Sequence, residues 1–151
     1  MAKLNLDKVQ ATKVGNIESV VGTVDLPNGS LVALGESKGR ELMEALAPEA
    51  DKELLLVKAP EVKYDETQDQ LDYTTKAGTP VTAIHLTEGD KFQVEQSLFE
   101  ATPTVGDVVT GSATYGYKVA GGTERTTFVV EALTKFGYDR RDMALLRVLT
   151  V

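Results

Sequence analysis

The chain has 151 residues, of which 42% are apolar and 26% are charged, and its net charge is −7. This composition can bury a hydrophobic core, and the length fits one domain or two small lobes that share a core. Because the chain has no cysteine and one histidine, disulfides, thiolate catalysis and metal sites built from cysteines or several histidines are excluded.

The first segment, residues 1–16, is polar and contains the spaced apolar residues Leu4, Leu6 and Val9. A tail of this kind is typical of an extended N-terminal arm that becomes ordered by adding a strand to a partner. A frayed terminus is the alternative interpretation.

Short β-branched runs and a strong turn signal follow the arm. Residues 20–24 and 31–35 are apolar runs that flank Pro27-Asn28-Gly29, and this pattern predicts a hairpin. Residues 36–47 are ambiguous, because their apolar residues fit one face of a short helix and also an irregular extended segment. Pro48 ends either structure.

A buried strand, a long loop and a second hairpin are predicted next. Residues 54–57 form a continuous apolar run, which is typical of a buried strand. Residues 61–78 are polar and predict a long loop. Apolar and polar residues then alternate over 82–86 and 91–95 on either side of the turn 87–90, which predicts a hairpin with its apolar face toward the core.

The remainder of the chain continues as short strands separated by glycine-containing turns, after a boundary at Thr102-Pro103-Thr104. Turn signals spaced about 8–12 residues apart predict a mainly β fold, an antiparallel β-barrel or sandwich with one short helix. We expect the arm at residues 1–16, a β-rich lobe at residues 17–100 and a C-terminal β lobe at residues 101–151 packed on the first.

His85 is the only imidazole in the chain and the first candidate for catalysis. It lies in the middle of a predicted strand, on the face opposite Ile84 and Leu86. An outward-facing histidine of this kind is typical of an exposed site or an interface, and no second base supports a serine or threonine nucleophile.

Carboxylate pairs and glycine-rich pieces are the other candidates for chemistry. The carboxylates that could do acid–base work or hold Ca²⁺ are Asp65-Glu66, Asp69 with Asp72, and Glu88 with Asp90. Each pair falls in a predicted loop or turn, and residues 65–72 lack the spacing of an EF-hand. Residues 35–39 and 116–122 lack the Lys-Ser/Thr of a phosphate-binding loop. We therefore expect no metal, no cofactor and no enzymatic activity.

Charge and hydropathy limit the partners. Residues 1–75 carry 8 basic and 14 acidic side chains, and the basic pair Arg140-Arg141 is flanked by acids, which predicts no nucleic-acid partner. No segment approaches the roughly 20 apolar residues of a membrane-spanning helix, and the N-terminus lacks the apolar stretch of a signal peptide. We expect a protein that is made in a cytoplasm and has no membrane partner.

The order of these motifs resembles the small head proteins of tailed bacteriophages, the capsid decoration or cement proteins. The segments that carry the resemblance are GTVDLPNGSLVALGE (22–36), LLLVKAPEVKYDE (54–66), DYTTKAG (72–78), VTAIHLTEGDKFQVEQSLF (81–99) and the closing strands of residues 126–151. The chain is longer than the short decoration protein of phage lambda and has an additional C-terminal β segment.

The resemblance implies a β-tulip-like fold and a structural role on the virion. Such proteins bind the outside of the expanded head, commonly as homotrimers, and bridge neighbouring subunits of the major capsid protein. By this resemblance the protein is made in the cytoplasm of the bacterial host, and Leu4, Leu6 and Val9 of the arm bind the capsid. A tail-tube or head–tail connector subunit and a small β-barrel ligand-binding module are the alternatives.

Overall fold

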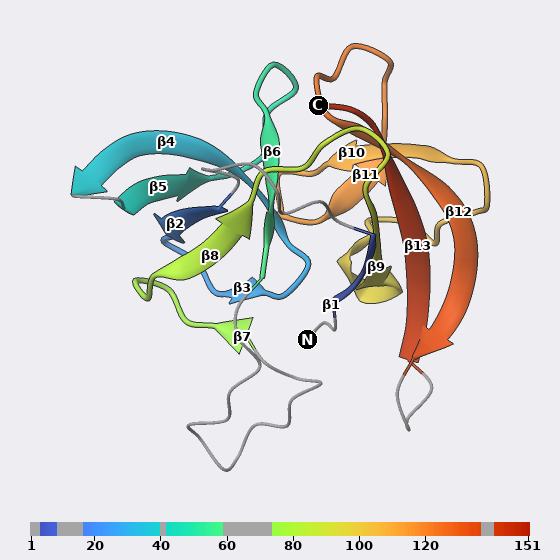
Figure 1. Ribbon diagram of the computed structural model, residues 1–151, viewed down its shortest axis with the longest axis horizontal. Helices are drawn as coiled ribbons and strands as arrows, with labels where there is room; N and C mark the ends of the chain where they lie inside the picture. The colour runs from blue at the N-terminus through green and yellow to red at the C-terminus, as the bar shows by residue number, and fades with distance from the viewer. Residues whose placement is uncertain (1–3, 9–16, 40–41, 59–73, 137–140) are drawn as a thin grey trace.

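A computed structural model describes residues 4–8, 17–39, 42–58, 74–136 and 141–151. The chain is mainly β, with 55% of it in strands and almost no helix, which confirms the predicted fold class. The strands form a six-stranded sheet and a closed barrel, which lie side by side in Figure 1.

The six-stranded sheet is antiparallel and draws strands from both ends of the chain. Its spatial order is β1 (Leu4–Lys8), β9 (Lys91–Glu95), β13 (Arg141–Thr150), β12 (Thr127–Phe136), β10 (Val108–Gly111) and β11 (Tyr117–Val119). The long hairpin β12–β13 forms its centre, and β1 and β11 are its edges (Figure 1). Since β1 and β9 precede residue 100 and the other four strands follow it, the sheet joins segments on both sides of the predicted boundary between the lobes.

The barrel is built from strands that lie between residues 17 and 84. Its spatial order is β2 (Ile17–Val21), β5 (Leu42–Leu46), β4 (Leu31–Gly39), β6 (Leu54–Val57) and β8 (Val81–Ile84). Neighbouring strands are antiparallel except for β2 and β5, which are parallel. Two short elements lie outside these bodies: the pair β3 (Leu26–Pro27) and β7 (Thr74–Thr75), and the 3₁₀ turn η2 (Gln96–Leu98).

The first predicted hairpin has its turn but not its strand pairing. The Ser30 N–H donates to the Pro27 carbonyl at 3.2 Å, and Gly29 has a φ of 92°, so the turn forms where Pro and Gly predict it. The flanking strands β2 and β4 do not pair with each other; β5 lies between them in the barrel. The predicted hairpin is therefore wrong.

The second predicted hairpin is wrong in the same way. The Asp90 N–H donates to the Thr87 carbonyl at 3.1 Å, which confirms the turn. However, β8 belongs to the barrel and β9 to the six-stranded sheet. The turn passes the chain from one body to the other, because β8 pairs with β2 and β6 while β9 pairs with β1 and β13.

The short helix considered for residues 36–47 is also wrong for the residues that the structure describes there. β4 and β5 occupy this region, and β5 is hydrogen-bonded by β4 on one side and by β2 on the other. Met43 and Ala45 alternate into the core of the barrel. Pairing of both strand edges outweighs the local helical pattern.

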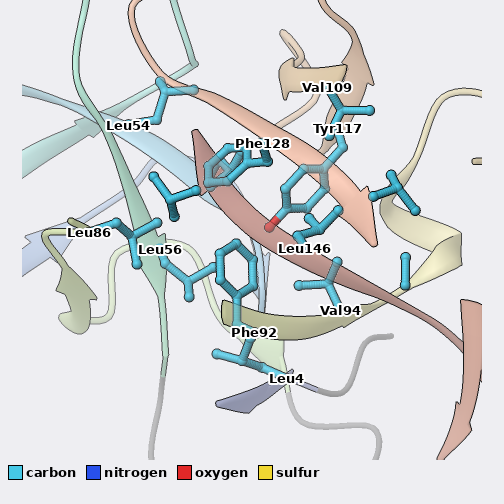
Figure 2. Packing of buried hydrophobic residues seen from close by; sticks show 14 of the residues in the cluster. Leu4, Leu54, Leu56, Leu86, Phe92, Val94, Val109, Tyr117, Phe128 and Leu146 are labelled. Carbon is cyan, nitrogen blue, oxygen red and sulfur yellow. The ribbon is translucent and has the colours of Figure 1, made fainter. Parts of the chain in front are cut away.

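The main hydrophobic core lies between the barrel and the six-stranded sheet (Figure 2). The barrel contributes Leu31, Leu54 and Leu56, the segment after β8 contributes Leu86, and the sheet contributes Phe92, Val94, Phe128 and Leu146. Phe128 packs edge-to-face with two rings, and its centroid lies 5.6 Å from that of Phe92 and 6.0 Å from that of Tyr117. A second, smaller core fills the barrel.

β6 explains the continuous apolar run at residues 54–57. Leu54 and Leu56 face the main core, whereas Leu55 and Val57 belong to the core inside the barrel. Because both faces of the strand are buried, the run has no polar alternation. The predicted buried strand is confirmed.

Tyr117 ties the two bodies together. Its fully buried hydroxyl donates to the Gly29 carbonyl at 2.7 Å, which links β11 to the turn before β4. The Leu31 N–H donates to the Tyr115 carbonyl at 2.8 Å in the same region. A buried hydroxyl with its hydrogen bond made fixes how the barrel sits on the sheet.

Candidate functional sites at the barrel mouth and the sheet edge

The structure places the predicted capsid-binding residues on β1 or outside the described residues. Leu4 pairs in register with Val94, and its side chain is 5% exposed and part of the main core. The backbone of Leu6 is in register with Phe92, while Val9 lies outside the described residues. Contact between Leu4 and a capsid therefore requires β1 to leave β9.

Replacement of Leu4 by alanine is expected to lower the free energy of unfolding by about 2 kcal/mol, the lower end of the range for buried leucines, since β1 is an edge strand. Urea denaturation measures the change. Leu149→Ala, at an exposed leucine of β13, is the control and should cost under about 0.5 kcal/mol. An equal, small cost for both variants would show that Leu4 is not held in the core.

Three polar side chains stand at one mouth of the barrel, where β2 and β6 begin and β8 ends: Glu18, Glu53 and His85. On each strand, the residue two positions away belongs to the core inside the barrel: Val20 for Glu18, Leu55 for Glu53 and Ala83 for His85. Side chains two positions apart lie on the same face of a strand. The face of β8 opposite Ile84 is thus the inside of the barrel. We call this group the barrel-mouth cluster.

His85 bridges the two carboxylates of the cluster. Its Nδ1 lies 3.1 Å from Glu53 Oε1 and its Nε2 lies 3.2 Å from Glu18 Oε1. The side chains of His85, Glu53 and Glu18 are 25%, 28% and 32% exposed. Partial burial acts to lower the pKa of His85, but hydrogen bonds and attraction from Glu53 and Glu18 outweigh it, and the pKa is raised.

A pocket of about 270 Å³ adjoins the cluster and shares Glu53 with it. Leu34 and Leu55 form its apolar wall, and the charged residues Asp51, Lys52 and Arg125 surround it. The two cations and two carboxylates leave it with no net charge, so the pocket does not favour an anion or a cation by charge alone.

A second pocket, also about 270 Å³, lies at the β11 edge of the six-stranded sheet. Its apolar lining comes from Phe99, Pro103, Val109, Tyr117 and Val119. The rings of Phe99 and Tyr117 are stacked with centroids 4.9 Å apart. The Ala120 N–H donates to the Val108 carbonyl at 2.9 Å, so strand alternation turns the backbone N–H and C=O of Val119 toward the open edge.

An exposed valine stands at this edge. Val119 lines the pocket and is 64% exposed. We call the pocket and Val119 the β11 edge surface. Val108 is also exposed, but it directly precedes Val109, the register partner of Val119, so its side chain points to the opposite face of the sheet. Elsewhere in the described part of the chain, the exposed large apolar side chains are Val24, Val105, Leu133 and Leu149. Single exposed apolar residues are ordinary, but one that lines an apolar pocket at a sheet edge suits a protein contact.

The other candidate residues have structural roles or lie outside the described residues. Asp90 Oδ2 accepts hydrogen bonds from the N–H and hydroxyl of Thr87, which is turn chemistry. Asp65, Glu66, Asp69 and Asp72 fall outside the described residues, as does Arg140. Among the residues that the structure does describe, no three His, Asp or Glu side chains are placed to hold a metal ion.

Sequence reasoning found His85 but missed Glu18 and Glu53. The signal was present in the alternation of positions 81, 83 and 85 and of positions 53, 55 and 57. It could not be used, because the sequence does not say that strands so far apart close into one barrel.

Comparisons with known proteins identify no family for this chain. No protein-family model matches the chain, and no curated protein matches its sequence. Within the described ranges, none of the helical structure has the length and apolar character needed to cross a membrane.

Proposed function

We propose that this chain is a decoration protein of a tailed-bacteriophage head, which binds the outside of the expanded capsid and bridges neighbouring subunits of the major capsid protein. The segments that resemble such proteins build the framework of both bodies. Residues 22–36 include β3 and most of β4, residues 81–99 include β8 and β9, and residues 126–151 include the β12–β13 hairpin. The resemblance therefore rests on the strands that define the fold.

In this proposal the protein acts by binding, as a homotrimer on the head surface. A contact of modest strength, repeated in many copies on a lattice, stabilises the shell strongly because each bound copy ties several subunits together. The acidic net charge of −7 suits an outer surface that does not contact the packaged nucleic acid.

The observation that carries the proposal is the β11 edge surface. It combines an apolar pocket, the exposed Val119 and a strand edge that is open at Val119, which together suit an extended segment of a protein partner with one apolar side chain in the pocket. Toward Tyr117 the edge is already covered, because the Glu100 N–H donates to the Tyr117 carbonyl at 2.9 Å. We assign the capsid contact to this surface rather than to Leu4, because the Leu4 side chain is already buried in the main core.

The copy number of the protein in gradient-purified phage particles tests the function. Quantitative mass spectrometry should find about one copy per subunit of the major capsid protein. A few to a few tens of copies would instead support a connector or tail subunit. Absence from the particles would overturn any virion role and favour a ligand-binding module.

Val119→Lys tests the surface. Placing a charge at the pocket is expected to weaken binding to purified expanded heads by at least about tenfold, because the ammonium group would have to give up its water where an apolar side chain of the partner packs. The free energy of unfolding should change by under about 0.5 kcal/mol, since the position is exposed. Val24→Lys, at an exposed valine between β2 and β3, is the matched control and should bind normally. Equal binding by both variants would contradict the assignment of this surface.

A further inference from the structure

We propose that the barrel-mouth cluster is a proton-operated clasp: protonated His85 bridges Glu18 and Glu53 and holds the barrel closed across β2, β8 and β6, and loss of its proton opens one side of the bridge. This inference goes beyond the capsid proposal and does not depend on it. It needs no partner, and it concerns the opposite body of the molecule from the β11 edge surface.

With both glutamates ionised, the geometry fits only a doubly protonated ring. Each ring nitrogen of His85 lies within 3.2 Å of a carboxylate oxygen, and a carboxylate can only accept a hydrogen bond. A neutral imidazole has one N–H and one lone pair, so it can donate to Glu18 or to Glu53 but not to both. In the neutral state, the lone pair of the other nitrogen faces a negatively charged oxygen. Only the imidazolium satisfies both contacts.

The clasp connects three consecutive strands of the barrel. β8 lies between β2 and β6, and Glu18 is on β2 while Glu53 directly precedes β6. β2 is otherwise held by four register pairs with β8 and three with β5. Breaking the His85–Glu18 contact therefore removes the only polar side-chain link across this mouth that the described residues show between β2 and β8.

The surrounding charges favour the protonated state. Besides Glu18 and Glu53, the described charged groups at this end of the barrel are Glu36 and Lys38 near the end of β4, and Asp51, Lys52 and Arg125 around the adjoining pocket. Lys52 is partly neutralised by Glu49, at 3.5 Å. The two carboxylates in direct contact dominate, because attraction falls with distance and the ring is mostly shielded from solvent.

Proton NMR gives the first test, because His85 is the only histidine and its ring protons can be assigned without ambiguity. The titration midpoint in the wild-type chain should lie above the ordinary histidine value of about 6.5. Glu18→Gln and Glu53→Gln should each lower it. Glu100→Gln, an exposed residue at the β11 edge, removes the same charge and should leave it unchanged. A midpoint at or below 6.5, or one that neither cluster variant lowers, would overturn the clasp.

Thermal unfolding gives the second test. A histidine with a higher pKa in the folded chain than in the unfolded chain adds stability that is fully present below about pH 6.5 and is lost as the pH rises through the folded-state pKa. Between pH 6 and pH 9, the melting temperature of the wild type should fall by about 2–4 °C more than that of His85→Gln. Parallel curves for the two proteins would contradict the clasp. If His85→Gln does not fold, Glu18→Gln takes its place in the comparison.

Discussion

Replacing Phe128 by alanine should lower the free energy of unfolding by about 3–5 kcal/mol, one of the two largest effects expected in this chain. Phe128 is completely buried on β12, between the sheet and the barrel (Figure 2). Its ring meets Phe92 at 86° and Tyr117 at 70°, both edge-to-face. Removal of the ring leaves a cavity against two aromatic side chains that cannot collapse into it. Urea denaturation followed by circular dichroism measures the loss.

Leu133→Ala is the matched control for this prediction. Leu133 lies on the same strand, but its side chain is 43% exposed, so its truncation should cost under about 1 kcal/mol. If the two variants cost the same, the sheet and the barrel do not share the core described here. A two-step unfolding curve for Phe128→Ala would show that the two bodies unfold separately once their junction is weakened.

The turns of this fold could be predicted from the sequence, whereas the strand pairing could not. Pro27, Gly29 and the 87–90 segment form turns because proline and glycine act on local dihedral angles, and Asp90 caps its own turn. Pairing depends on residues far apart in the chain. β9 pairs with β13, some fifty residues later, and this contact separates β9 from its neighbour β8.

The same reason limits prediction of the barrel-mouth cluster. A strand with one apolar face normally turns its opposite face to solvent, so the sequence predicts that His85 faces outward. β8 is instead enclosed on both sides: Ile84 is buried on one face, and Ala83 belongs to the barrel core on the other. Ala83 is small and its neighbours Thr82 and Ile84 are β-branched, so the sequence of β8 carries no sign of a second buried face. Residues 54–57, buried on both faces, were the one clear sequence sign of a two-layered core.

Gly116→Ala should cost about 2–3 kcal/mol, for a reason unrelated to loss of apolar contacts. A Cβ at position 116 would overlap the carbonyl oxygen of Leu98 and lie 3.2 Å from its carbonyl carbon. This backbone is fixed, because the Glu100 N–H donates to the Tyr117 carbonyl at 2.9 Å and the Phe99 ring stacks on Tyr117. To make room, the segment after η2 must move away from β11 and disturb the pocket beside it. Chemical denaturation measures the cost.

Gly39→Ala is the control for this prediction, and its expected change in stability has the opposite sign. A Cβ at position 39 has nothing within 4 Å, and the backbone there is not in the left-handed region. Alanine should therefore leave stability unchanged or raise it by about 0.5 kcal/mol, since it restricts the unfolded chain.

Because the Gly116 substitution also moves one wall of the β11 edge surface, Gly116→Ala should weaken capsid binding more than its loss of stability explains. Full binding by folded Gly116→Ala would separate the capsid contact from this pocket.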